Sequence, residues 1–109
     1  MLKPGDVVLA DLRGAQGIKR RPTVVVSSDL YLAQGLDVIV GELTTQLAKS
    51  TTPTDYLLQD WAAAGLHYPT AFRSYLGTVT IASTVVIGHL TDRDWQEVQA
   101  RLRLALAVT

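Results

Sequence analysis

The strongest constraint on this chain is a series of short β-branched runs, each bounded by glycine, proline, serine or threonine. The run most favourable to a β-strand covers residues 23–28 (TVVVSS), and comparable runs cover residues 7–10, 38–40, 76–81 and 84–88. Valine, isoleucine and threonine fit a pleated, half-buried surface, whereas their restricted χ1 angles disfavour helices. The chain is therefore predicted to form a sheet of several short strands.

A basic segment precedes the most β-favouring run. Residues 13–22 (RGAQGIKRRP) contain two glycines, a proline and four basic side chains, and they have neither helical nor strand periodicity. This composition predicts a mobile loop. Pro22 is expected at the first position of the following strand, because it has no amide hydrogen to donate to a neighbouring strand. The basic side chains would then stand on a loop held by a stiff strand.

The middle of the chain is less regular. Residues 29–35 are predicted to form a loop with a short turn of helix, and residues 36–45 a strand centred on Val-Ile-Val. Residues 46–65 stay open, because residues 50–54 (STTPT) interrupt regular structure whereas residues 56–58 are a candidate short strand. This order favours a meander of strands.

The C-terminal segment has a helical pattern. Thr91 is predicted to cap the helix and Leu90 to pack onto Trp95, while acidic residues in the first turn suit the helix dipole. One apolar stripe at helical spacing is formed by Trp95, Val98, Leu102 and Leu106. Five or six strands followed by one helix predict a mainly β (α+β) fold, a small β-barrel plugged or flanked by that helix.

Composition limits the classes of protein that remain. A chain of 109 residues with 48% hydrophobic content suffices for one core, so residues 1–109 are predicted to form a single domain. Its 10 basic and 10 acidic residues give no net charge, so any binding of nucleic acid must be local. It has no cysteine, which excludes disulfides, thiolate metal sites and cysteine nucleophiles. Without a signal peptide or a membrane-length apolar run, a cytoplasmic protein is expected.

Two groups of residues are candidates for chemistry. Lys19, Arg20 and Arg21 form a tight cationic cluster that is able to hold phosphate, although three consecutive basic residues are equally typical of a solvated loop. Thr44 ends an apolar strand and would present a hydroxyl at the rim of the sheet. Threonine is also favoured in strands for purely structural reasons. Spacing alone leaves these alternatives open.

The histidines and aromatic residues are weaker candidates. His67 and His89 lack further ligands at a recognisable spacing, so no metal site is predicted. Four aromatic side chains are able either to stack on unpaired bases or to pack in the core or a dimer interface. The core or interface is favoured for at least half of them: Trp61, Tyr68, Phe72 and Tyr75.

Four segments, taken in order, resemble the MazF/PemK family of toxin endoribonucleases. Residues 5–12 resemble the family's opening strand, residues 19–27 its basic loop and second strand, and residues 37–44 the strand with its catalytic hydroxyl. Residues 87–95, followed by residues 105–107, resemble its closing strand and C-terminal helix. The resemblance implies an SH3-like β-barrel of the MazF/PemK/CcdB type, a homodimer, an antitoxin partner, and cleavage of single-stranded RNA without a metal or other cofactor.

The resemblance also implies the site residues. The family's catalytic arginine falls on Arg21 and its threonine or serine on Thr44, with Thr45 as the substitute if the register is off by one. Arg21 would stabilise charge on the phosphoryl oxygens while an RNA 2′-hydroxyl attacks phosphorus, and Thr44 would donate a hydrogen bond to the same phosphate. The products would be a 5′-hydroxyl and a cyclic or 3′-phosphate. The expected RNA contacts are Gln16, Lys19, Arg20, Glu42, Thr45 and Arg73.

Two positions depart from the family's pattern. Many members carry a glutamate in the loop before the basic residues, where this chain has Gln16, and Glu42 is a candidate substitute on the face of Thr44. The family often has an arginine where Gly77 precedes Thr78 here. An arginine is a poor general base, so the group that accepts the proton of the 2′-hydroxyl is not identified.

Two other functional classes remain beside a ribonuclease. A gyrase poison of the related type would be expected to carry a C-terminal tryptophan, whereas this chain ends in ALAVT. A degenerate member that acts only by binding protein stays open, because the departures at Gln16 and Gly77 fit it equally well.

Overall fold

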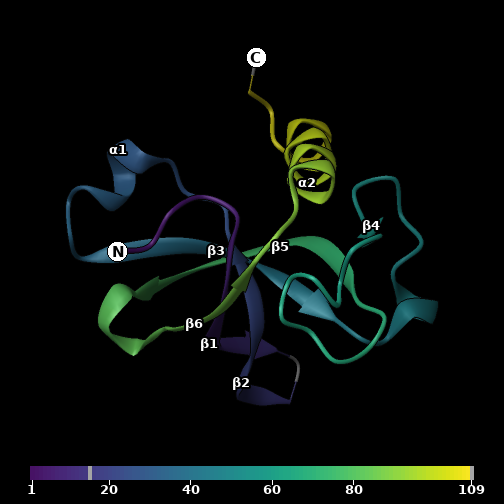
Figure 1. The fold of residues 1–109 in the computed structure, drawn as a ribbon, viewed down its shortest axis with the longest axis horizontal. Coiled ribbons are helices and arrows are strands. Elements are labelled where there is room, and N and C mark those ends of the chain that lie inside the picture. Colours follow the sequence, from purple (N-terminus) through teal and green to yellow (C-terminus); the bar gives the residue numbers. More distant parts are fainter. Residues whose placement is uncertain (15, 109) are drawn as a thin grey trace.

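The computed structural model describes residues 1–14 and 16–108, and over these residues the chain forms a six-stranded antiparallel sheet (Figure 1). The strands are β1 (Asp6–Gly14), β2 (Gly17–Val25), β3 (Asp37–Thr44), β4 (Tyr56–Leu57), β5 (Ala71–Thr80) and β6 (Val85–His89). Their order across the sheet is β4-β5-β3-β2-β1-β6. The helices are α1 (Asp29–Leu32), α2 (Asp92–Ala105) and the single 3₁₀ turns η1 (Leu47–Lys49) and η2 (Ile81–Ser83). The curled half-barrel with a C-terminal helix confirms the predicted fold class.

Residues 13–14 and 16–22 form the outer half of a hairpin, so the predicted loop is wrong. The β1 and β2 strands pair continuously from Val7 with Val24 to Gly14 with Gly17. Gly17 has φ +102°, which suits the turn; Ala15 lies outside the described residues. Each residue from 17 to 22 gains a partner in β1, and this pairing outweighs the poor strand propensity of the segment.

Pro22 lies inside β2 and not at its start, which corrects the predicted position. The Val25 carbonyl accepts from Gly5 on the β1 side, whereas the Val26 amide donates to Ile39 on the β3 side. Because backbone groups alternate along a strand, the Pro22 nitrogen faces the β3 side. The β2–β3 ladder ends at Thr23, so Pro22 deprives no partner of a hydrogen bond.

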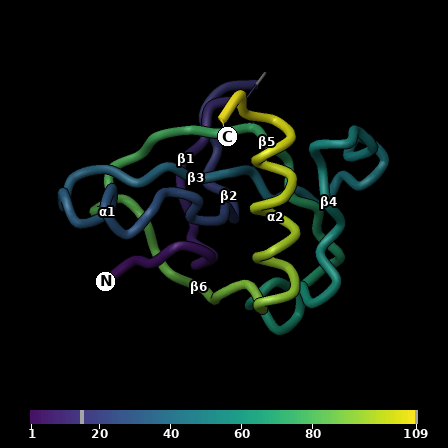
Figure 2. The backbone as a smooth tube through the Cα atoms, turned by 90° about the horizontal axis from the view of Figure 1, so that it is seen from above, coloured from purple at the N-terminus to yellow at the C-terminus, as the bar shows by residue number. Residues whose placement is uncertain are grey.

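The sheet is buried on both faces near its centre. Side chains of β1 to β3 alternate between two cores. One core contains Val7, Val24, Leu43, Phe72 and Val98, and the other contains Leu2, Val8, Leu12, Val25, Leu32, Val38 and Val40. Helix α2 covers the first core and lies beside β4 (Figure 2). Burial on both faces explains why these strands have continuous apolar runs.

Helix α2 begins as predicted and ends one residue earlier than the apolar stripe requires. The Thr91 hydroxyl oxygen accepts from the Asp94 amide, which confirms the N-cap. Val98 is buried, and Trp95 and Leu102 pack against the same core. Leu106 is the C-cap with extended backbone and is 43% exposed, so its predicted place in the stripe is wrong. In residues 1–14 and 16–108, no helix is long and apolar enough to cross a membrane.

Two glycines allow the segment after β4 to lie directly against β6. Gly65 has φ +86°, and a Cβ there would overlap the carbonyl oxygen of Ile87. A Cβ on Gly88 would overlap the carbonyl oxygen of Ala64 in the same way. This close approach of two backbones positions residues 65–68 beside the strand ends described below.

Gly65→Ala is expected to lower the free energy of unfolding by about 3 kcal/mol, because it adds a backbone overlap to the strain of a positive φ. Gly35→Ala is the matched control, since Gly35 also has a positive φ (+79°) but no atom lies within 4 Å of its Cβ position. The control should lose only about 1 kcal/mol. Urea unfolding of both variants measures the difference. Equal losses would contradict a close approach at Gly65.

Candidate active site

Side chains alternate along a strand, and this places the polar end of β3 on the sheet face that carries the second core, the one that contains Val38 and Val40. The strand is continuous from Asp37 to Thr44, so Glu42 and Thr44 lie on the same face as Val38 and Val40. Val38 and Val40 are fully buried, whereas Glu42 and Thr44 are partly exposed. The two polar side chains therefore lie just beyond the edge of this core, on a strand fixed by its buried half.

The same alternation places two basic residues of β2 on this face. Lys19 and Arg21 share the face of Val25, and β2 pairs with β3 up to Thr23 opposite Glu42. Continuing this register by two residues sets Arg21 opposite Thr44. The pairing of the basic segment with β1 thus holds Arg21 on a rigid strand and not on a mobile loop.

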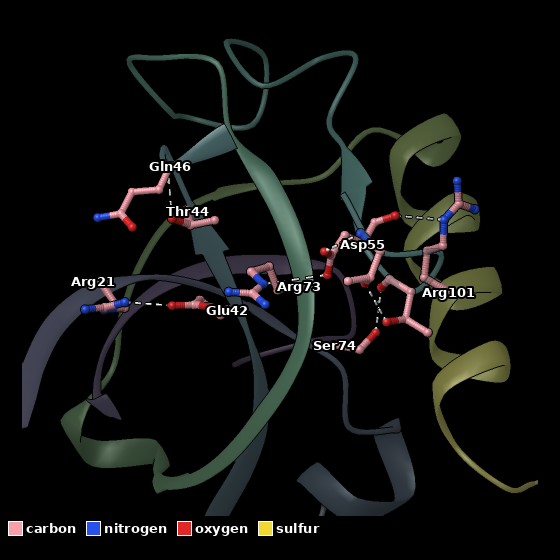
Figure 3. Close-up of polar contacts among 10 residues, drawn as sticks. Arg21, Glu42, Thr44, Gln46, Asp55, Arg73, Ser74 and Arg101 are labelled. Carbon is pink, nitrogen blue, oxygen red and sulfur yellow. Dashed lines mark hydrogen bonds and ion pairs between the residues drawn. The ribbon is translucent and has the colours of Figure 1, made fainter. Parts of the chain in front are cut away.

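Arg21 and Glu42 form a short ion pair. The distance between Arg21 Nη1 and Glu42 Oε1 is 2.7 Å, and the side chains are only 29% and 13% exposed (Figure 3). Among the described residues, Arg21 Nε is buried without a hydrogen-bond partner. Buried donors of this kind cost free energy unless a ligand satisfies them. Arg21 is therefore held in place by Glu42 and keeps donor capacity for an anion.

Thr44 keeps its hydroxyl hydrogen available. Its Oγ1 accepts a hydrogen bond from the Gln46 amide at 3.1 Å. A threonine hydroxyl has one donor and two acceptor positions. Because the local amide uses an acceptor position, the O–H of Thr44 is left to donate to a ligand.

A β-bulge in β5 brings Arg73 to the site. The register jumps from Gly41 opposite Leu76 to Glu42 opposite Arg73, so two residues of β5 are left over at this point. Arg73 Nε lies 3.7 Å from Asp55 Oδ1, which is too long for a hydrogen bond, and this Nε has no partner among the described residues. Figure 3 shows Arg21, Glu42 and Arg73 side by side on three neighbouring strands.

Two hollows flank the ends of β2 and β3. The first, of about 550 Å³, is mainly apolar and reaches Leu66, His67 and Tyr68. The second, of about 510 Å³, lies on the Arg21–Glu42 side. Four residues line both hollows: Lys19, Arg21, Thr44 and Gln46. The described lining of the second hollow has the basic residues Lys19, Arg21, Lys49 and Arg73 against the single acid Glu42. The chain thus has a local positive site despite its zero net charge.

The residues predicted from the sequence are only partly brought together. Gln16, Lys19, Glu42 and Arg73 line the second hollow with Arg21 and Thr44, and Lys19 Nζ lies 3.4 Å from Gln16 Oε1. Thr45 lines only the first hollow. Arg20 also lines only the first hollow. It points to the opposite face of the sheet from Arg21, where its Nη1 donates to the Ser83 carbonyl at 3.1 Å and lies 3.4 Å from Asp11.

Several lining residues were not singled out from the sequence. Gln46 lines both hollows, and it lies two residues after Thr44, a spacing that alternation would have indicated. Lys49 enters through the turn η1, which has no sequence signal of its own. Of the four aromatic residues that the sequence did single out, Tyr68 and Tyr75 line one hollow each and are 69% and 50% exposed. Phe72 is fully buried and Trp61 packs against the core, so the core interpretation is right for half of the four aromatics.

The fold and these side chains define a class: a small antiparallel half-barrel with a basic hollow at the ends of two strands. The chain belongs to the family of PemK-like, MazF-like toxins of type II toxin-antitoxin systems, whose profile it matches over residues 3–106. A search of the curated proteins finds no significant match.

Several solved structures share this fold. An endoribonuclease in complex with its cognate antitoxin, from a mycobacterial species, is 21% identical with a TM-score of 0.81, over 100% of this chain and 98% of that chain. Toxin MazF-mt6 from Mycobacterium tuberculosis is 19% identical with a TM-score of 0.76, over 95% and 98%. MazF from Deinococcus radiodurans is 18% identical with a TM-score of 0.74, over 98% and 97%. At these identities the likeness establishes the fold.

Proposed function

We propose that this protein is the toxin of a type II toxin-antitoxin system and cleaves single-stranded RNA at a specific sequence without a metal ion. The observation that carries the proposal is the arrangement of Arg21 and Thr44, both with unused donors, in a basic hollow of a MazF/PemK-family fold. Similar folds occur in proteins described as endoribonucleases, which supports the same activity here.

The proposed reaction is an in-line transfer at phosphorus. The RNA 2′-oxygen attacks the adjacent phosphorus and loses its proton, the bond from phosphorus to the 5′-oxygen breaks, and the 5′-oxygen takes up a proton. Negative charge grows on the non-bridging oxygens. Arg21 and the Thr44 hydroxyl would donate to these oxygens, and such fixed donors stabilise the transition state more than the ground state. The products are a 5′-hydroxyl and a 2′,3′-cyclic phosphate, which can open to a 3′-phosphate.

The two hollows suggest where the single-stranded RNA would lie. A phosphate bound by Arg21 and Thr44 would sit on the boundary between the hollows, because both residues line each of them. The nucleotides on its two sides would then occupy one hollow each. Exposed Tyr68 in the first and Tyr75 in the second are suited to stacking on unpaired bases.

The partners and setting follow from the same family assignment. We propose that the chain acts as a single domain, as a homodimer in the cytoplasm, and that an antitoxin protein inhibits it. MazE-MazF and toxin-antitoxin complexes of similar fold support the antitoxin. The competing function is a degenerate member that binds protein and cuts no RNA.

The test is incubation of the purified protein with mixed single-stranded RNA in the presence of EDTA, followed by mapping of the cut ends. Discrete cuts that leave 5′-hydroxyls are expected. Intact RNA would overturn the ribonuclease and favour the degenerate binding module. Cleavage that appears only when Mg²⁺ is added would overturn metal independence alone.

Thr44→Val is expected to reduce the cleavage rate about a hundredfold, because it removes one donor to the phosphate while it retains the side-chain shape. Thr45→Val should have a smaller effect, since Thr45 lines only the first hollow. Thr78→Val, on β5 outside both hollows, is the control for loss of a strand hydroxyl. If Thr45→Val has the larger effect, the catalytic hydroxyl is that of Thr45.

A further inference from the structure

We propose that Glu42 is the group that accepts the proton of the attacking 2′-hydroxyl; this inference rests on the proposed ribonuclease function and completes its mechanism. The reaction needs a base, and neither Arg21 nor Thr44 is suited to that role. An arginine is always protonated, and a threonine hydroxyl is too weak an acid-base group at neutral pH. Among the described residues that line the two hollows, Glu42 is the only carboxylate.

Glu42 is fixed by one carboxylate oxygen and open at the other. Its Oε1 accepts from Arg21 Nη1 at 2.7 Å. No hydrogen bond to Oε2 occurs among the described residues, and the side chain keeps 13% of its surface exposed beside the second hollow. A general base needs this combination of a fixed orientation and a free lone pair within reach of the substrate.

The ion pair with Glu42 leaves other hydrogen-bond donors of the Arg21 guanidinium free for the phosphate. Glu42 contacts Nη1 only, whereas Nε has no partner and Nη2 forms no hydrogen bond among the described residues. The guanidinium fork presents five donors in one plane, so it can bind a carboxylate at one nitrogen and a phosphate at the others. The same arginine would thereby hold the base and the phosphate next to each other.

The position of Glu42 along β3 determines on which side of the bound phosphate the base would lie. Thr44 lies two residues beyond Glu42 on the same face, and Glu42 lines the second hollow only. A phosphate at Arg21 and Thr44 would therefore have Glu42 on the side of the second hollow. The geometry assigns the ribose that carries the attacking 2′-hydroxyl to this hollow and the leaving 5′-oxygen to the first.

The described groups around the carboxylate are basic or neutral. Arg21 contacts it from β2, and Lys19, Arg73 and Lys49 line the same hollow from β2, β5 and η1. The Tyr75 hydroxyl, from β5, donates to the Arg13 carbonyl at 2.8 Å. Asp55 lies on the other side of Arg73, 3.7 Å from its Nε. No second carboxylate in the described lining of this hollow competes with Glu42 for the proton.

In the proposed step, a lone pair of Glu42 Oε2 takes the 2′-hydroxyl proton while the 2′-oxygen forms its bond to phosphorus. The bond from phosphorus to the 5′-oxygen breaks, and its electron pair leaves with that oxygen. Water in the open first hollow supplies the proton that makes the 5′-hydroxyl. Glu42 returns its proton to solvent before the next turnover.

Glu42→Gln tests this assignment, with Glu97→Gln on α2 as the matched control for loss of a carboxylate. Glu97 pairs with Arg101 at 3.6 Å and lines neither hollow. Cleavage of the mapped RNA site should fall at least about a hundredfold in Glu42→Gln and stay unchanged in the control. A copy of that RNA with a 2′-O-methyl group at the cleaved position should bind Glu42→Gln as tightly as wild type, or more tightly, because one negative charge is gone.

The outcomes separate three roles of Glu42. Faster cleavage by Glu42→Gln would mean that the carboxylate merely competes with phosphate for Arg21, and it would overturn the base. Weaker binding of the 2′-O-methyl RNA in proportion to the lost rate would mean that Glu42 only positions Arg21. A substrate with sulfur in place of the bridging 5′-oxygen needs no acid for its leaving group; recovery of the rate on this substrate would mean that Glu42 is the acid and not the base.

A pH profile of the wild type keeps the inference testable if Glu42→Gln does not fold. His67 in the first hollow is the other titratable candidate, and free imidazoles titrate about two pH units above free carboxylic acids. The pH profiles of wild type and His67→Gln should have the same shape, because Glu42 and not His67 accepts the proton. A midpoint in the imidazole range that disappears in His67→Gln would overturn Glu42. If wild type cuts no RNA, the ribonuclease itself is overturned, whereas normal cutting by Glu42→Gln overturns only the base.

Discussion

Arg21→Ala is expected to reduce RNA cleavage about a thousandfold. Arg21 is the cation that the sheet holds most firmly at the boundary of the two hollows, through β1 pairing and the 2.7 Å contact with Glu42. Loss of a single fixed donor to a transition-state oxyanion costs about a hundredfold or more, and loss of an arginine in phosphoryl transfer costs about a thousandfold or more. Single-turnover cleavage of the mapped RNA site measures the loss.

Arg21→Lys separates charge from geometry. Lysine keeps the positive charge but has neither the planar fork nor the reach to two oxygens at once. We expect it to recover only a small part of the lost rate, because the site must bind Glu42 and the phosphate at the same time. Recovery to near the wild-type rate would contradict bidentate recognition.

Two controls exclude trivial explanations for the loss. Arg103→Ala on α2 removes an exposed arginine that lines neither hollow and should leave cleavage unchanged. Arg21→Ala also removes the partner of Glu42, which is worth about 1 kcal/mol for a partly exposed pair. Thermal unfolding should therefore show a small decrease in Tm. If Arg21→Ala does not fold, Arg21→Lys is tested in its place, because its retained positive charge supports folding.

The sequence was sufficient for the fold class because the local signals agree with the tertiary structure. β-branched runs became strands, and Thr91 capped a helix whose Val98 is buried. The hairpin of residues 13–22 was missed for a physical reason: its strand character comes from pairing with β1 and not from its own propensity. Local patterns cannot report a partner that lies elsewhere in the chain.

The site was predictable in part. The resemblance indicated Arg21 and Thr44, and strand alternation placed Glu42 on the face of Thr44. The contact between Arg21 and Glu42 depends on the register of β2 against β3, and the position of Arg73 depends on a bulge in β5. Neither register nor bulge is readable from one sequence, because each depends on packing across the sheet.

The largest expected loss of stability is for Asp94→Ala, about 3 to 5 kcal/mol, because its carboxylate is a fully buried charge with three hydrogen bonds. It accepts from the Tyr56 hydroxyl at 2.7 Å, the Gln59 amide at 3.0 Å and the Asp60 amide at 2.8 Å. Burial, followed by this hydrogen bond, raises the pKa of Tyr56, so its hydroxyl remains a donor. The variant leaves all three donors unsatisfied and releases residues 56–60 from α2.

Asp92→Ala is the matched control for this prediction, since Asp92 is an acid of the same helical turn but is exposed. It should lose only about 0.5 kcal/mol, the usual value of an acidic side chain near a helix N-terminus. Thermal unfolding should then show a decrease in Tm of more than about 10 °C for Asp94→Ala and of a few degrees for the control. Because the side chains of Arg21, Glu42 and Thr44 lie on the opposite face of the sheet from the core that α2 covers, Asp94→Ala that remains folded at low temperature should still cleave RNA. Equal destabilisation of the two variants would contradict the role of Asp94 as the buried link between α2 and the segment after β4.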